Sequence, residues 1–102
     1  MDKTAIQIRD VDHVATAVVE LRPGENVLVS GIRSGHLIMA RERIPVGHKI
    51  ALRDIGADEE ILKYGEPIGI ATADIRAGQW VHVHNCRGAK ARRFDRRKET
   101  QA

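Results

Sequence analysis

Leu21-Arg-Pro-Gly-Glu-Asn-Val27 shares one spacing pattern with Ile75-Arg-Ala-Gly-Gln-Trp-Val81: an apolar residue, a small turn with glycine, and a second apolar residue. The segment Ile55-Gly-Ala-Asp-Glu-Glu-Ile61 is a degenerate third copy. In each copy the first apolar residue ends one strand and the last one opens the next. The pattern indicates either a structural repeat or common turn chemistry that recurs in a β-rich chain.

Short apolar runs bounded by Gly, Pro or Asp surround these turns and predict a series of β-strands. Pro23 and Gly24 stand in the order that a type II turn requires, which favours a chain reversal there. Only residues 57–64 have helical composition, and this segment is too short to form a helix without tertiary support. We therefore predict an all-β fold with at most one short helix. The predicted strands cover residues 13–21, 26–30, 36–40, 49–55, 61–64, 67–72 and 80–85.

The composition describes one small domain with an aliphatic core. The chain has 102 residues, of which 42% are hydrophobic but only 3% aromatic, so Val, Ile, Leu and Ala must fill the core. No apolar run approaches the ~20 residues that span a bilayer, and the first residues do not read as a signal peptide. Cys86 is the only cysteine, which excludes an intrachain disulfide. We expect a cytoplasmic protein that does not enter a membrane.

The positive charge is concentrated at the C-terminal end. Residues 87–102 hold seven of the 17 Lys and Arg residues and two of the 14 Asp and Glu residues, so this tail carries a net +5 and residues 1–86 a net −2. The domain itself has no basic excess, which argues against a nucleic-acid interface. We predict an N-terminal extension over residues 1–9, a domain over residues 10–86, and a flexible basic tail over residues 87–102.

Trp80-Val-His-Val-His-Asn85 is the segment most informative about chemistry. Strand alternation places His82 and His84 on one face with Trp80. Two imidazoles about 7 Å apart could share a divalent metal ion or bind an oxyanion. The alternative is a pair of solvated histidines on a half-exposed strand, since no third ligand stands nearby in the sequence.

Three other sets of residues could carry chemistry. In Lys63-Tyr-Gly-Glu-Pro67 a cation and a phenol precede a turn, where they could face a carboxylate; the alternative is a plain turn with Tyr64 in the core. His48, like His13 and His36, stands at the end of a predicted strand and is by itself a surface residue. The thiol of Cys86 has no assured base beside it, so the sequence does not favour a nucleophile.

Five motifs follow one another in unbroken order. They are Asp12-His-Val-Ala-Thr-Ala17, Gly47-His-Lys-Ile-Ala-Leu-Arg-Asp-Ile55, Lys63-Tyr-Gly-Glu-Pro-Ile-Gly69, Ala71-Thr-Ala-Asp-Ile75 and Val81-His-Val-His-Asn85. Together they resemble the SAF domain of the altronate and galactarate dehydratase family over about residues 10–86. The resemblance implies a β-clip fold of short, curled strands. Two positions depart from the family pattern: His13 stands where relatives usually show Asn, and the turn at residues 56–60 lacks the usual Gly-Glu.

The resemblance implies the small subunit of a two-component sugar-acid dehydratase, a hydro-lyase that is inactive without its large catalytic subunit. Family members remove water from aldonic or aldaric acids, and a related sulfolactate sulfo-lyase removes sulfite. The alternatives are therefore the small subunit of such a sulfo-lyase, or a stand-alone ligand-binding module of the SAF type without catalysis. The implied cofactor is a divalent metal, iron(II) in the family, held mainly by the large subunit. A homo-oligomer is compatible with these expectations.

The resemblance also implies which residues face the site, while the base that abstracts the proton is expected on the large subunit. The lysines are assigned to the substrate carboxylate, and the basic tail to docking on the large subunit. The expected residues are His82, His84 and Asn85 as catalytic, His82 and His84 also as metal ligands, and His48, Lys49, Lys63 and Tyr64 as substrate-binding.

Overall fold

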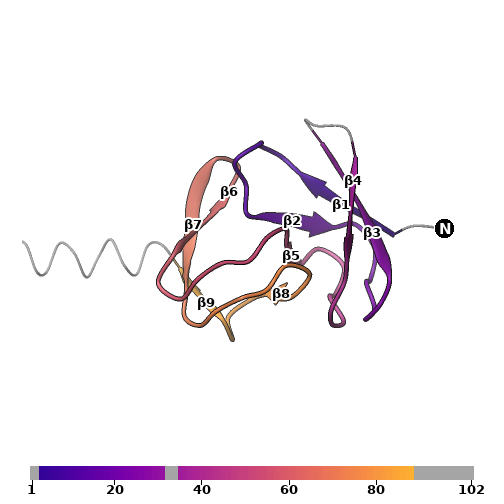
Figure 1. Cartoon of the computed structure of the whole chain (residues 1–102). Helices are drawn as coiled ribbons and strands as arrows, with labels where there is room; N and C mark the ends of the chain where they lie inside the picture. Colours follow the sequence, from indigo (N-terminus) through magenta and orange to yellow (C-terminus); the bar gives the residue numbers. More distant parts are fainter. Residues whose placement is uncertain (1–2, 32–34, 89–102) are drawn as a thin grey trace, which may run out of the picture.

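The computed structural model describes residues 3–31 and 35–88, which form nine β-strands in two sheets (Figure 1). The first sheet has the strand order β4-β3-β1-β2-β5-β8, and the second has the order β6-β7-β9. Within the described ranges no segment is helical, so no helix there could cross a membrane. The strands are β1 (Lys3–Gln7), β2 (Val14–Ala17), β3 (Asn26–Gly31), β4 (His36–Met39), β5 (Lys49–Ala51), β6 (Glu60–Lys63), β7 (Glu66–Ala71), β8 (Trp80–Val81) and β9 (Cys86–Gly88).

The all-β prediction is confirmed, and the two curled sheets agree with a β-clip fold. The helix considered for residues 57–64 does not form: a turn leads directly into β6, because Ile61 is fully buried and pairs with Gly69 of β7. Strand β1, which the apolar pattern does not predict, lies between β2 and β3 and pairs with both. The basic tail predicted to be flexible and to dock on a partner lies outside the described residues from position 89 onward.

The turn pattern occurs four times, so the repeat predicted from three copies is structural. The fourth copy is Ile44-Pro-Val-Gly-His-Lys-Ile50, which sequence comparison missed. Each copy has one turn residue with positive φ, a glycine in three copies and Asp58 (φ 71°) in the fourth. The copies associate in two pairs through isolated β-bridges, one between Leu21 and Ile44 and one between Ile55 and Ile75.

Reciprocal backbone hydrogen bonds hold each pair of turns together. Across the first bridge, the N–H groups of Leu21 and Ile44 each donate to the other's carbonyl at 2.9 Å. The turn residue with positive φ then donates its N–H to the carbonyl of the alanine four residues before the paired copy, and all four alanines are buried. A methyl side chain lets the opposite turn approach this closely. The four bonds run from Gly24 to Ala40, Gly47 to Ala17, Asp58 to Ala71 and Gly78 to Ala51.

Each pair of turns encloses its own hydrophobic core. Leu21 and Ile44 belong to the first cluster, with the inner face of β1, β2 and β3, and Ile55 and Ile75 belong to the second. Full burial of each of these side chains stabilises the fold by about 1.5–3 kcal/mol. Strands β2 and β5 connect the clusters, because Val14 and Ala51 face the second while their neighbours face the first. In Figure 1 both strands lie between the β6–β7 hairpin and strands β3 and β4.

The carboxylate of Asp12 fixes the β6–β7 hairpin to the first sheet. This side chain is buried, at 5% exposure, and accepts hydrogen bonds from the N–H groups of Arg9 (2.9 Å), Tyr64 (3.0 Å) and Gly65 (2.8 Å). Tyr64 and Gly65 both have positive φ, as the two central residues of a type I′ hairpin turn require. The Tyr64 side chain is 53% exposed, so it does not pack in the core.

His13 forms the second connection between the sheets. Its Nδ1 accepts a hydrogen bond from the N–H of Leu62 at 3.1 Å, at the register shift between Ile61 and Leu62. The ring is buried, and its Nε2 faces Arg53 and Glu59. Burial lowers the pKa of His13 below its usual 6.5, and the positive charge of Arg53 lowers it further. The neutral ring therefore holds the junction, because protonation of Nδ1 would remove the acceptor for Leu62.

We predict that Gly78→Ala destabilises the protein far more than Gly24→Ala. Both glycines have positive φ, which costs an alanine about 1 kcal/mol. At Gly78 the added Cβ would lie 2.2 Å from the Met39 carbonyl oxygen, whereas at Gly24 it meets no heavy atom within 4 Å. Urea unfolding should give losses of about 3 kcal/mol or more for Gly78→Ala and about 1 kcal/mol for Gly24→Ala. Equal losses would contradict the close packing of the paired turns.

We also predict that His13→Asn reduces the acid sensitivity of the fold. Because the pKa of His13 is lowered on folding, the unfolded chain binds the proton more strongly, and stability falls as the pH drops below about 6.5. Asparagine keeps an acceptor for the Leu62 N–H and does not titrate. Urea unfolding between pH 7.5 and pH 5 should show a weaker pH dependence in this variant, and His36→Asn, at an exposed position on β4, should behave as the wild type. An unchanged slope in His13→Asn would refute the junction's dependence on the neutral ring.

Candidate functional site

Three imidazoles and an indole meet beside the paired strands β5 and β8; we call His48, Trp80, His82 and His84 the Trp80 cluster. The His82 ring stacks on the indole at 5.3 Å between centroids, with 9° between the planes. His84 lies 5.1 Å from the indole, and the His48 ring lies 4.7 Å from that of His82. The indole Nε1–H also donates a hydrogen bond to His48 Nδ1 at 3.2 Å. The fold thus brings His48 to the two histidines predicted to act together.

A turn, and not strand alternation, gathers these rings. Strand β8 ends at Val81, and the chain then reverses, with the N–H of Asn85 donating to the carbonyl of His82 at 3.0 Å. Val81 is fully buried but Val83 is 80% exposed, so the predicted continuation of the strand to residue 85 is wrong. His82 and His84 nevertheless both contact Trp80, because the turn folds each ring back against the indole.

Asn85 braces this turn through both ends of its amide. Its Oδ1 accepts the N–H of His82 at 2.9 Å, and its Nδ2 donates to the Trp80 carbonyl at 2.8 Å. Its own carbonyl accepts the N–H of Thr72, and the residue is 9% exposed. These contacts position the backbone of His82. The catalytic role that the family resemblance implies for Asn85 stays a prediction.

The cluster has a neutral imidazole beside a cation. Lys49 on β5 pairs opposite Val81, one residue away from His82. Loss of hydration lowers the pKa of His82, and the nearby His48, Lys49 and His84 lower it further through charge repulsion. The lowered pKa favours the uncharged form of His82, so the site combines this ring with the Lys49 ammonium. Such a combination can bind the oxygens of an organic anion.

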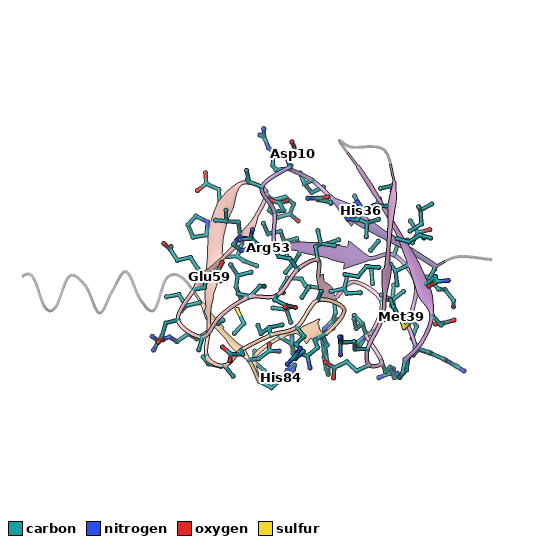
Figure 2. The ribbon with its side chains drawn as sticks, in the orientation of Figure 1. Asp10, His36, Met39, Arg53, Glu59 and His84 are labelled. Carbon is teal, nitrogen blue, oxygen red and sulfur yellow. The ribbon has the colours of Figure 1, made fainter. Side chains whose placement is uncertain are left out.

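Lys63 and Tyr64 lie away from the Trp80 cluster. They occupy the β6–β7 turn, where the Lys63 ammonium lies over the Tyr64 ring at 4.9 Å from its centroid. Tyr64 lines a hollow together with Asp10. Figure 2 places Asp10 and His84 at opposite ends of the molecule. The seven residues predicted for the site therefore form two separate surfaces, with His48, Lys49, His82, His84 and Asn85 together on one of them.

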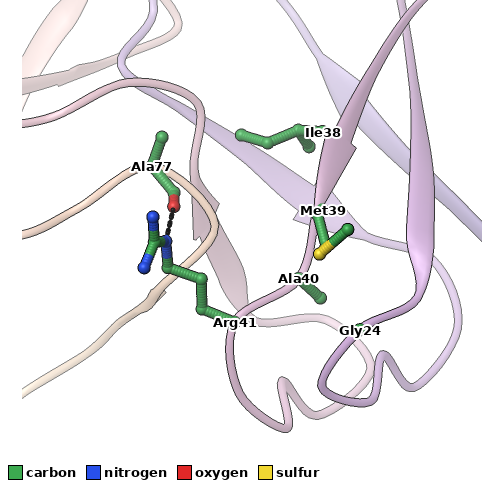
Figure 3. A pocket seen from close by; sticks show the side chains of 6 residues that line it. All are labelled: Gly24, Ile38, Met39, Ala40, Arg41 and Ala77. Carbon is green, nitrogen blue, oxygen red and sulfur yellow. Dashed lines mark hydrogen bonds between the residues drawn. The ribbon is translucent and has the colours of Figure 1, made fainter.

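Another hollow, of about 510 Å³, opens between the end of β4 and two of the repeated turns (Figure 3). Its walls are backbone and small or apolar side chains. Its one cation, Arg41, donates through Nε to the carbonyl of Ala77 at 3.0 Å. The lining therefore offers no acid, base or nucleophile for a reaction. It consists of Gly24, Ile38, Met39, Ala40, Arg41 and Ala77.

A complete metal site is not assembled by the described part of the chain. No group of three or more His, Cys, Asp or Glu side chains there is arranged to hold a metal ion. One nitrogen of His48 is already engaged by the indole, and the Glu42 carboxylate beside the cluster is engaged by the backbone N–H of Trp80. His82 and His84 could supply at most part of a ligand set, so a metal would need further ligands from elsewhere. The thiol of Cys86 is half-buried, and burial raises its pKa, which makes it a poor nucleophile.

Sequence reasoning missed the roles of Trp80 and Glu42. The chain's only tryptophan makes ring contacts with all three histidines of the cluster. Glu42 accepts the backbone N–H of Trp80 at 2.9 Å, a contact between positions 38 residues apart that no local pattern reveals. A usable signal did exist for His48: the fourth copy of the turn pattern places it where the other copies carry Glu or Gln.

Comparison with known proteins places these features in one family. The chain is 43% identical to altronate dehydratase from Escherichia coli over 80% of its own length, but it spans only 16% of that enzyme. It is 36% identical to the (2R)-sulfolactate sulfo-lyase subunit alpha of Chromohalobacter salexigens, matching 58% of this chain and 77% of that subunit. The corresponding subunit of Paracoccus pantotrophus is 38% identical, with 59% and 90% matched.

These relatives are lyases, and those named alpha subunits imply a partner subunit in their enzymes. The family model described as the altronate/galactarate dehydratase SAF domain matches residues 3–89, which include all nine described strands. The resemblance drawn from five short motifs is therefore confirmed over nearly the whole described chain. The protein belongs to the altronate/galactarate dehydratase SAF domain family.

Proposed function

We propose that this chain is the small subunit of a two-subunit lyase that eliminates sulfite from a sulfonated hydroxy acid. The observation that carries this proposal is coverage: the chain matches 77% and 90% of two sulfo-lyase alpha subunits, but a small part of the dehydratases. The sequence motifs favour a sugar-acid dehydratase, with the sulfo-lyase as an alternative, and the coverage favours that alternative.

The proposed reaction is a β-elimination. A base removes the proton from the carbon that bears the hydroxyl and carboxylate groups, and the electron pair of that C–H bond forms a carbon–carbon double bond. The C–S bond breaks, and its electron pair leaves with sulfite. The resulting enol takes up a proton at carbon and loses its hydroxyl proton to give a 2-keto acid. The partner subunit supplies the base in this proposal.

The Trp80 cluster supports a role in holding the anionic substrate. Lys49 supplies a positive charge, and the rings of His48, His82 and His84 can donate to or accept from its oxygens. A sulfonated hydroxy acid carries two anionic groups, which suits a surface of this composition. Any divalent metal would be held mainly by the partner, because His82 and His84 provide too few ligands.

Dehydration of a sugar acid is the second candidate function. It is favoured by the higher identity to altronate dehydratase. The two reactions share proton removal next to the carboxylate and differ in the leaving group, which is hydroxide in the dehydratases. A single assay can therefore separate them by product.

The first test is the reaction of the assembled complex. The tagged chain would be purified with its partner from the native host, and the complex supplied with racemic sulfolactate, altronate or galactarate. We expect sulfite and 2-keto acid to appear together from sulfolactate. Release of 2-keto acid from altronate or galactarate alone would replace the sulfo-lyase with the dehydratase. Absence of product from all three acids in a stable complex would reject both.

The second test removes the histidines of the cluster. We expect His82→Ala/His84→Ala to lower kcat/KM of the complex by about 10²-fold or more, as loss of groups that contact the reacting acid does. The matched control is His36→Ala, an exposed histidine on β4 that lies apart from His84 in Figure 2. Circular dichroism and partner binding should be unchanged in both variants. Full turnover by the double variant would remove the cluster from the site.

A further inference from the structure

The four copies of the turn differ at their fifth residue, which is a histidine in one copy and Glu or Gln in the others. The fifth residue of the pattern is Glu or Gln in three copies, and its side-chain oxygen accepts the N–H of the second residue of the same copy. These caps join Glu25 to Arg22 at 2.7 Å, Glu59 to Gly56 at 2.9 Å and Gln79 to Arg76 at 2.7 Å. The side chain at this position is thus normally committed to the turn.

His48 occupies the capping position in the remaining copy, where no backbone N–H needs to be capped. The second residue of its copy is Pro45, which has no backbone N–H to be satisfied. The turn itself is still closed, because the N–H of His48 donates to the Pro45 carbonyl at 3.1 Å. The proline therefore allows an imidazole to stand where the other copies need a capping oxygen.

Trp80 is held rigidly against this imidazole. Its backbone N–H donates to Glu42, its carbonyl accepts from Asn85, and it pairs with Ile50 across the sheet. The indole also packs against the first hydrophobic cluster. With backbone and ring fixed, the indole N–H has a defined direction, and it points to Nδ1 of His48.

This contact determines which nitrogen of a neutral His48 carries the proton. The indole N–H can only donate, so Nδ1 must accept and be unprotonated. We propose that Trp80 is a positioning residue that holds His48 in the Nε2–H tautomer, so that His48 offers an N–H donor to an oxygen of the anionic substrate. The role in substrate binding rests on the proposed function, but the tautomer does not. Trp80→Phe removes the N–H and keeps an aromatic ring for stacking on His82.

The tautomer can be measured directly by two-bond ¹H–¹⁵N correlation spectra of the ¹⁵N-labelled chain above pH 7.5. In the wild type we expect His48 to show Nδ1 as an unprotonated and Nε2 as a protonated ring nitrogen. In Trp80→Phe the ratio of the two tautomers should fall by about five-fold, the effect of one hydrogen bond. His13 is the internal control, because its Nδ1 accepts from the Leu62 N–H in both proteins.

A second variant keeps the test valid if Trp80→Phe does not fold. His48→Ala removes the acceptor, so the indole N–H should exchange with solvent several-fold faster than in the wild type. A wild-type His48 protonated at Nδ1, or an indole N–H whose exchange is unchanged in His48→Ala, would overturn the proposal.

Activity separates this inference from the proposed function. In the assembled complex, Trp80→Phe should lower kcat/KM about five-fold for whichever acid is turned over, and the His36→Ala control should not. A shifted tautomer with unchanged kcat/KM would show that His48 does not donate to the substrate. A complex without activity on any acid would reject the proposed function, while the tautomer measurement on the isolated chain would still stand or fall by itself.

Discussion

The reciprocal hydrogen bonds between paired turns are the constraint on which the rest of the molecule depends. The positive-φ residue of each copy donates to the carbonyl of the alanine four residues before the opposite copy, and each bridging Leu or Ile exchanges two bonds with its counterpart. These contacts satisfy the backbone at the centre of each pair and bury the bridging side chains. The described part of this chain, which has few aromatic residues, therefore forms two small cores without a helix of its own to cover them. The loops, strands and sheets follow from how the four turns are paired.

The candidate site is built on one of these repeated turns. Where a proline removes the N–H that other copies must cap, the capping position holds His48, and the paired strands β5 and β8 bring it to Trp80. The second turn, at residues 82–85, returns two more imidazoles to the indole and is itself closed by Asn85. His48 thus occupies a position where no backbone hydrogen bond is lost, because Pro45 has no N–H that a side chain would need to cap.

The two sheets meet at a polar junction, which sets the position of the β6–β7 turn. The Asp12 carboxylate accepts three backbone N–H groups, and the neutral His13 ring accepts a fourth. The Lys63 and Tyr64 side chains are presented by this junction on a surface of their own, far from the Trp80 cluster. If the domain meets a larger partner through both surfaces, the junction fixes their separation, because each is attached to a different sheet.

The sequence by itself determined the all-β class, three of the four turns and the family, and it predicted His82 and His84 as site residues. These follow from local physics: glycine at positive φ, apolar residues at strand ends, and motifs of fixed spacing. Only the tertiary structure decided that His48 lies beside His82, that the Trp80 indole donates to His48, that the Asn85 amide closes the turn at residues 82–85, and that Lys63 and Tyr64 lie elsewhere. The contacts around Trp80 join residues that are far apart in the sequence. Glu42 and Trp80, for example, are 38 positions apart, and the pairing of the turns brings them together where no local pattern could show it.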